Sequence, residues 1–117
     1  MRSIAIIGAS ADRSKFGNKA VRAYHAQGWI VFPVNPSADR IEGLKVFRSI
    51  RDVPPPLDRV SMYLPPEKAL TLIDDIAAVQ PTEFWLNPGS ESDLLIEAAR
   101  ACGLNVIVAC SLLDIGA

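Results

Sequence analysis

The chain has few of the residues that build metal or disulfide sites. Its 117 residues include two cysteines, Cys102 and Cys110, and a single histidine, His25. Two thiols are too few for a disulfide framework, so we expect both to be reduced and structural. One histidine and two distant cysteines match no zinc-site spacing, and no second histidine is available for a catalytic triad. We therefore predict no metal site and no catalytic residues, and we expect His25 to be a partly buried residue of a helix.

The chain also lacks an excess of charge and a long apolar run. Its 12 basic and 13 acidic residues leave a formal net charge of -1, which does not favour a nucleic-acid partner. No apolar run approaches the ~20 residues of a membrane span, and no charged leader precedes the first apolar residues. A hydrophobic share of 50% is typical of a globular protein. We expect one cytoplasmic domain over residues 1–117 that binds neither membrane nor nucleic acid.

What the chain does contain is a set of five apolar runs. They lie at residues 3–7, 30–34, 59–64, 83–86 and 104–110. Runs this continuous are typical of strands buried on both faces, as in a parallel sheet. Apolar residues at spacings of three and four predict helices around residues 20–28, 69–77 and 95–102. The alternation predicts a three-layer α/β fold with a doubly wound, mostly parallel sheet and right-handed crossovers.

Local signals indicate where these helices begin and end. The prolines at 65–66 fix φ at a helix start, and Ser90, followed by acidic residues, is a predicted N-cap. Gly28 and Gly103 stand where helices should end. The sequence leaves the segment at residues 43–57 open. The prolines at 54–56 break any regular element between residues 50 and 57, and residues 43–47 form either a short edge strand or only a bend.

The loop after the first run carries the strongest functional signal. The run ends at Gly8, Arg13 and Lys15 follow, and a helix is predicted to begin near Gly17. Free N–H groups at a helix start favour anions, and Gly17 would let backbone approach a ligand closely. Neither the Gly-x-Gly-x-x-Gly pattern nor a P-loop is present. We predict a phosphate site with Ser10 as a donor; the alternative is a tight turn with solvated charges.

The end of the second run lacks the acidic residue that binds the ribose hydroxyls of NAD. Asn35 and Pro36 stand there instead, and Arg40 follows. A neutral amide and a nearby guanidinium disfavour NAD and tolerate a ribose that carries its own phosphate. The ligand could then be NADP or a 3′-phosphorylated adenosine such as that of coenzyme A. The alternative is a simple turn with a surface charge.

Seven short motifs that together span nearly the whole chain carry a family resemblance. They are Ile7-Gly8-Ala9-Ser10, Lys15-Phe16-Gly17-Asn18, Phe32-Pro33-Val34-Asn35-Pro36, Ile41-Glu42-Gly43, Tyr63-Leu64-Pro65-Pro66, Trp85-Leu86-Asn87-Pro88-Gly89 and Ala109-Cys110-Ser111-Leu112. In this order they resemble the small single-domain CoA-binding proteins, which are similar in turn to the CoA-binding domain of the succinyl-CoA synthetase alpha subunit. The resemblance implies a Rossmann-like domain that binds coenzyme A or an acyl-CoA non-covalently.

The resemblance also implies where such a ligand would lie. The pyrophosphate is expected at the first loop and helix start: Gly8, Ala9, Ser10, Lys15, Phe16, Gly17 and Asn18, with Arg13 as a further cation. The adenosine is expected at the second strand end: Val34, Asn35, Pro36 and Arg40. Two further loops are expected to wall the crevice: Leu64, Pro65 and Pro66, and, toward the pantetheine arm, Asn87, Pro88 and Gly89. Phe16 is the aromatic residue best placed to contact an adenine.

The chain departs from the synthetase in two respects. It lacks the domain that carries the catalytic phosphohistidine, and only Arg40 is available to represent the lysine after the second strand. We therefore expect a binding module rather than an enzyme, with Cys110 as an inert core thiol. Two alternatives remain: an NADP-dependent or acyl-CoA-using enzyme subunit completed by a partner chain, and a vestigial Rossmann unit used for protein contacts. A homodimer and a separate partner protein both stay open.

Overall fold

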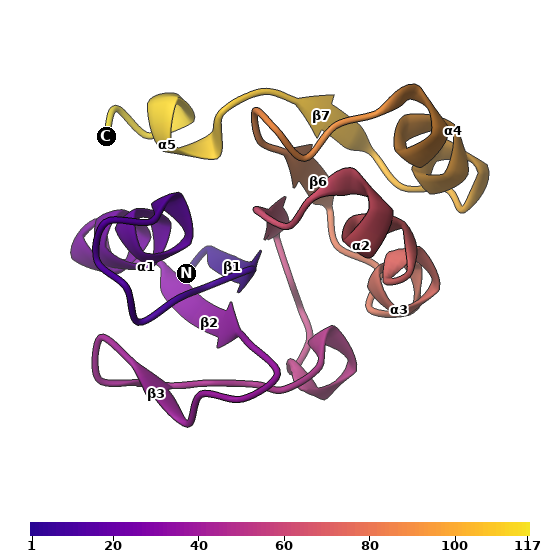
Figure 1. The fold of residues 1–117 in the computed structure, drawn as a ribbon. Helices are drawn as coiled ribbons and strands as arrows, with labels where there is room; N and C mark the ends of the chain where they lie inside the picture. Colours follow the sequence, from indigo (N-terminus) through magenta and orange to yellow (C-terminus); the bar gives the residue numbers. More distant parts are fainter.

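A computed structural model describes residues 1–117 and shows one five-stranded parallel sheet between two layers of helices (Figure 1). The strands are β1 (Ser3–Ile7), β2 (Ile30–Val34), β5 (Arg59–Met62), β6 (Glu83–Leu86) and β7 (Val106–Val108). Their spatial order is β2-β1-β5-β6-β7. The five apolar runs therefore form the five strands, and the predicted doubly wound α/β fold is confirmed. Strands β5 and β7 are shorter than their runs because residues 63–64 of the one run, and residues 104–105 and 109–110 of the other, belong to no strand.

The helices divide between the two faces of the sheet. They are α1 (Phe16–Ala26), α2 (Pro66–Leu70), α3 (Ile73–Ala78), α4 (Asp93–Ala101) and α5 (Ser111–Asp114). Buried side chains of α1 and α5 form one core cluster with the sheet, and those of α2, α3 and α4 form another. Figure 1 shows the same division, with α1 and α5 on one side of the picture. No helix has both the length and the apolar character needed to cross a membrane.

Strand β1 shows why the apolar runs are continuous. Ile4 and Ile6 pack in the cluster that includes Tyr24 of α1, whereas Ala5 and Ile7 pack in the cluster on the opposite face. Successive side chains of a strand point to opposite faces, so a strand between two helix layers is apolar at most positions, and in β1 only Ser3 is polar. All five residues of β1 are buried.

Two helix boundaries differ from the predictions. The pattern around residues 69–77 forms two short helices, α2 and α3. Thr71 is the C-cap residue of α2, and its hydroxyl donates to the carbonyl oxygen of Lys68 at 2.6 Å. The N-cap of α4 is Ser92, which accepts a hydrogen bond from the N–H of Leu95 at 3.1 Å, and not Ser90. Ser90 instead closes a turn, since its N–H donates to the carbonyl of Asn87 at 2.9 Å.

Between β2 and β5 the chain leaves the sheet, forms a separate hairpin and then returns to the edge of the sheet. Strands β3 (Arg40–Ile41) and β4 (Leu44–Lys45) form an antiparallel hairpin, and a 3₁₀-helix, η1 (Ile50–Asp52), precedes the proline run. Between them Phe47 returns beside β2: its N–H donates to Pro33 at 2.9 Å, and its carbonyl accepts from Asn35 at 3.0 Å. The edge of the sheet is thereby extended by one short parallel pairing.

The rarest side chains lie closer to solvent than expected. His25 is exposed rather than partly buried, because it follows the buried Tyr24 directly and so points about 100° away around α1. Cys102 is exposed at the end of α4, and Cys110 is half-buried. Both thiols are free, but Cys102 is not a core residue.

Candidate functional site

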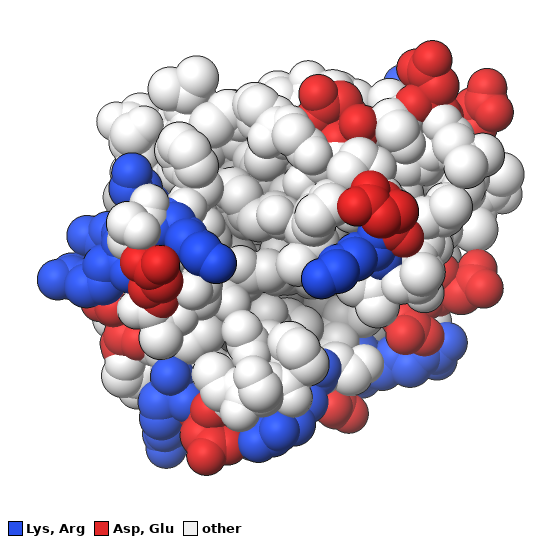
Figure 2. Space-filling model, viewed as in Figure 1, with Lys and Arg blue, Asp and Glu red and all other residues white.

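A cavity of about 770 Å³ opens at the carboxyl ends of β1, β2 and β5. It lies where the strand order reverses, since the chain passes from β1 to β2 on one side and returns to β5 on the other. The face shown in Figure 2 is hollowed near its centre. These predicted residues line the cavity: Gly8, Ala9, Ser10, Lys15, Phe16, Gly17, Val34, Asn35, Pro36, Leu64, Pro65 and Pro88.

The cavity is positively charged although the chain as a whole is not. Lys15, Arg48 and Lys68 line it, and no acidic residue does. Figure 2 shows basic side chains on either side of the hollow. A concave site lined by charge of one sign concentrates ligands of the opposite sign. The cavity therefore favours an anion.

The turn between β1 and α1 depends on two glycines. Gly8 has a φ of +90°, which side-chain-bearing residues rarely adopt, and a Cβ there would lie 3.2 Å from Tyr63. A Cβ on Gly17 would lie only 2.2 Å from the carbonyl oxygen of Gly8. Gly17 therefore also has a structural role, because it lets the start of α1 pack against the end of β1. The close approach of its backbone to a ligand stays a prediction.

This close packing leaves several backbone donors free. The N–H groups of Ala9, Ser10, Phe16 and Gly17 donate to no atom of the chain. All four residues line the cavity. Unpaired N–H groups at the start of a helix, together with the helix dipole, form a binding site for negatively charged oxygens.

Two asparagines hold the loop that carries these donors. The side-chain amide of Asn35 donates to the carbonyl of Ala9, and that of Asn18 donates to the carbonyl of Ser10, each at 2.9 Å. Both carbonyl oxygens are thereby hydrogen-bonded. In a trans peptide the carbonyl and the N–H of the next residue point in opposite directions, so the next N–H points away from the asparagine. Asn18 is fully buried and supports the loop from behind rather than lining the cavity.

Not every predicted residue reaches the cavity. Those outside its lining are Arg13, Asn18, Arg40, Pro66, Asn87 and Gly89. The guanidinium of Arg13 lies 3.5 Å from the carboxylate of Glu42 in the hairpin turn. Arg40 is exposed on β3, and its one polar contact is with the carbonyl of Gly43 at 3.5 Å. Neither guanidinium is therefore among the cations of the cavity.

Asn87 lies behind the cavity wall and joins three elements. Its amide nitrogen donates to the Ser61 hydroxyl and to the Met62 carbonyl, and its Oδ1 accepts from the N–H of Ser111, all at 2.8 Å. The cavity residue Tyr63 reaches the same place, with its hydroxyl 3.2 Å from the Ser111 hydroxyl. Burial raises the pKa of Tyr63, so this hydroxyl stays protonated at neutral pH.

Sequence reasoning missed several residues of the lining. They are Arg48, Ser49, Ile50, Tyr63, Lys68, Thr71 and Leu72. Tyr63 and Lys68 stand next to the predicted Leu64-Pro65 loop, so a wider window around that loop would have included them. Residues 48–50 belong to the segment whose structure the sequence left open, and nothing local indicates that it returns to the cavity.

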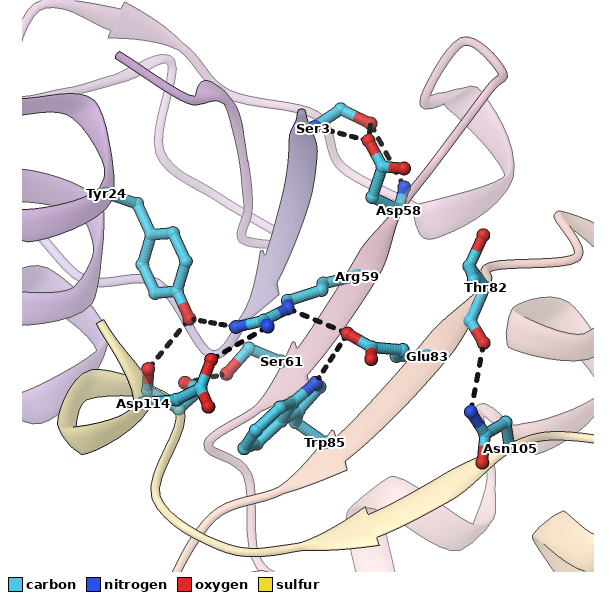
Figure 3. A network of polar contacts seen from close by, with 11 residues as sticks. Ser3, Tyr24, Asp58, Arg59, Ser61, Thr82, Glu83, Trp85, Asn105 and Asp114 are labelled. Atoms are coloured by element: carbon cyan, nitrogen blue, oxygen red, sulfur yellow. Dashed lines mark hydrogen bonds and ion pairs between the residues drawn. The ribbon is translucent and has the colours of Figure 1, made fainter. Parts of the chain in front are cut away.

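A second polar group lies at the opposite end of the sheet, at the start of β5 (Figure 3). The guanidinium of Arg59 donates to Glu83 at 2.8 Å and to the Tyr24 hydroxyl at 3.1 Å, and it lies 2.8 Å from Asp114 of α5. It also stacks over Trp85, 4.6 Å from the ring centroid. Every part of this buried cation is therefore in contact with a partner within the chain.

Comparison with known proteins agrees with this geometry. The family model described as "CoA binding domain" matches residues 2–115. The uncharacterized protein YneT of Bacillus subtilis is 22% identical over 107 residues, which are 92% of this chain and 79% of that protein. The alpha subunit of an ADP-forming acetate–CoA ligase of Pyrococcus furiosus is 36% identical over 67 residues. That match covers 55% of this chain but only 14% of the ligase subunit.

Solved structures show the same two kinds of relative. A conserved hypothetical protein of Pyrococcus furiosus superposes with a TM-score of 0.89 at 31% identity, covering 97% of this chain and 99% of that one. The dinucleotide-forming acetyl-coenzyme A synthetase 1 of Ca. Korarchaeum cryptofilum superposes with a TM-score of 0.79 at 31% identity, covering 92% of this chain and 26% of the synthetase. The chain thus resembles small separate proteins over most or all of their length and one part of a larger enzyme. It belongs to the family of CoA-binding domains, as the match over residues 2–115 shows.

Proposed function

We propose that residues 1–117 form one binding unit that holds coenzyme A, free or acylated, non-covalently and without catalytic machinery of its own. The observation that carries this proposal is the set of unpaired N–H groups at the start of α1, in a cavity with three basic residues and no acidic one. Such a site suits the diphosphate of a nucleotide. Membership of the CoA-binding family supports coenzyme A among the diphosphate ligands.

In this proposal the ligand spans three strand ends. The pyrophosphate lies against the N–H groups of Ser10 and Gly17, with the ammonium groups of Lys15 and Lys68 nearby. The adenosine lies at Asn35 and Pro36, as the general geometry of doubly wound sheets predicts for the end of the second strand. The pantetheine arm leaves past the loop at residues 64–65 toward Pro88.

Titration calorimetry tests the proposal with four ligands: CoA, dephospho-CoA, NAD and NADP. We expect CoA to bind tightest and NAD weakest, because Asn35 and Pro36 stand directly after β2 in place of the acidic residue that binds the ribose hydroxyls of NAD. Mass spectrometry of protein purified without added ligand gives a second readout, since a retained ligand of the mass of CoA would support the proposal. Equal affinity for all four ligands, or no binding of any, would contradict it.

A further inference from the structure

One basic residue of the cavity stands apart from the other two. Arg48 lies beside the end of β2, whereas Lys15 is next to α1 and Lys68 is in α2. Its guanidinium donates to the carbonyl of Pro36 at 3.1 Å and to the carboxylate of Asp39 at 2.8 Å. Arg48 is thus the guanidinium that the structure brings to the place where an adenosine ribose is expected.

The topology explains why this residue is there. After the hairpin the chain returns beside β2, and Phe47 pairs in parallel with Val34. Residues that follow two parallel neighbouring segments emerge at the same edge of the sheet. Arg48 therefore stands next to Asn35, although thirteen positions separate the two in the sequence.

Arg40, the cation nearest to β2 in the sequence, does not take this place. It lies in β3 with an exposed side chain, and it does not line the cavity. The hairpin carries Arg40 away from the strand end, and the return of the chain brings Arg48 toward it. The two arginines are matched in charge and differ in position.

We propose that Arg48 determines specificity by binding a phosphate group carried on the adenosine ribose of the ligand; this inference rests on the proposed function. A guanidinium presents parallel N–H donors that fit phosphate oxygens bidentately. The Arg48 side chain is 58% exposed, and its contacts with Pro36 and Asp39 use two of its donors, so others remain available for a phosphate. Asp39 and the Pro36 carbonyl hold the guanidinium at the strand end.

The test compares CoA with dephospho-CoA, which differ only in the 3′-phosphate. In the unaltered chain we expect CoA to bind more tightly. Arg48→Gln should weaken CoA binding about tenfold, the usual effect of losing a charged hydrogen-bond pair, and should leave dephospho-CoA binding unchanged. Arg40→Gln is the matched control and should leave both affinities unchanged. Dephospho-CoA binding also reports that each variant is folded.

Three other outcomes would overturn the inference. An equal loss of affinity for both ligands in Arg48→Gln would show that this residue does not recognise the ribose phosphate. A selective loss in Arg40→Gln would assign that recognition to Arg40 instead. Failure of the unaltered chain to bind CoA at all would overturn the proposed function and, with it, the role of Arg48.

The position of the phosphate on the ribose is tested separately. Adenosine 3′,5′-bisphosphate and adenosine 2′,5′-bisphosphate present the two alternatives as small soluble probes. Tighter binding of the 3′ isomer, abolished in Arg48→Gln, would support a CoA-type ligand. Tighter binding of the 2′ isomer would indicate an NADP-type nucleotide and would contradict the CoA assignment.

Discussion

The two ends of the sheet use basic side chains in opposite ways. At the amino end, the Arg59 side chain is 6% exposed and is in contact with two carboxylates, a tyrosine hydroxyl and two indole rings. At the carboxyl end, Lys15 and Lys68 line an open cavity and form no ion pair in the structure. The backbone N–H groups between them are also unpaired.

This difference is the one expected between a structural site and the proposed binding site. A buried charge costs free energy unless it is paired, so Arg59 has every partner within the chain. A ligand site must instead leave donors unpaired until the ligand arrives. The amino end therefore holds α5 on the sheet through Asp114. The carboxyl end keeps its backbone donors and both lysines free, and only Arg48 there is paired, with Asp39. Substitutions at the two ends should separate stability from affinity.

The largest effect is expected at the amino end. Arg59→Met removes the donor shared by Glu83, Asp114 and Tyr24, and we expect it to lower the free energy of unfolding by about 3 kcal/mol. Urea denaturation measures this loss. CoA affinity of the folded variant should be unchanged, because Arg59 does not line the cavity.

Arg51→Gln is the control for Arg59→Met. Arg51 forms a surface ion pair with Asp75, and losing such a pair costs at most about 1 kcal/mol. If Arg59→Met were as stable as this control, the buried contacts of Arg59 would contribute little and the comparison of the two ends would fail.

The second-largest effect is expected at Gly17, where one substitution should lower both the stability of the protein and its affinity for CoA. In Gly17→Ala the new methyl group would collide with the Gly8 carbonyl, and we expect a loss of about 2 kcal/mol in the free energy of unfolding. Because the collision displaces the start of α1, CoA affinity should fall as well. Chemical denaturation and calorimetry on the same preparation measure the two losses.

Gly43→Ala distinguishes a collision from backbone strain. Gly43 has a φ of +77° but no atom within 4 Å of an added Cβ. This variant should lose about 1 kcal/mol of stability and no CoA affinity. Full CoA affinity in Gly17→Ala would show that the packing of Gly17 on Gly8 does not position the donors.

The third effect is expected in affinity alone. Exchanging both cavity lysines, Lys15→Gln with Lys68→Gln, should weaken CoA binding about tenfold and reduce its dependence on salt. Stability should change by less than about 0.5 kcal/mol, as for other exposed substitutions. Calorimetry at two salt concentrations measures this change.

Arg100→Gln removes one charge from α4, outside the cavity, and serves as the control. It should alter neither the affinity nor its salt dependence. If Arg100→Gln weakened CoA binding as much as the double lysine variant does, the net charge of the protein, and not the cavity, would attract the ligand.

The smallest effect concerns alkaline pH. Burial raises the pKa of Tyr24 at the amino end and of Tyr63 at the cavity above the ordinary value of 10.0. The folded state then holds these protons more tightly than the unfolded state. Their stabilising contribution is full below pH ~10 and is lost as the pH rises through the folded-state values. Urea midpoints measured across this range should fall with pH.

Tyr24→Phe lacks the hydroxyl contacts of Tyr24 and should be less stable at neutral pH. Its urea midpoint should fall less steeply with rising pH than that of the unaltered chain. A slope identical to that of the unaltered chain would mean that Tyr24 ionises equally easily in both states.

Features predicted correctly from the sequence are those set by local patterns. Strands buried on both faces are apolar at most positions, so residues 3–7 indicate a central strand without further information. Helices end where a glycine takes a positive φ, as Gly28 and Gly103 do at +86° and +83°. The loop from Gly8 to Gly17 was recognisable because two glycines and a helix start stand close together.

Features missed from the sequence depend on where distant segments meet. The hairpin turn brings Glu42 to Arg13, which removes that cation from the cavity, and no pattern near Arg13 indicates this pairing. The sequence predicts too much burial for Cys102 and His25, because spacing gives the apolar face of a helix but not how far its neighbours extend.

The amino-acid sequence by itself determined the five strands, the layered α/β architecture and the glycine turn at the start of α1, because each follows from the chemistry of neighbouring residues. Only the tertiary structure decided which cations surround the cavity. Arg48 replaces Arg40 at the end of β2 because the chain leaves the sheet and returns, and long-range pairing, not distance along the sequence, determines which side chains share a site.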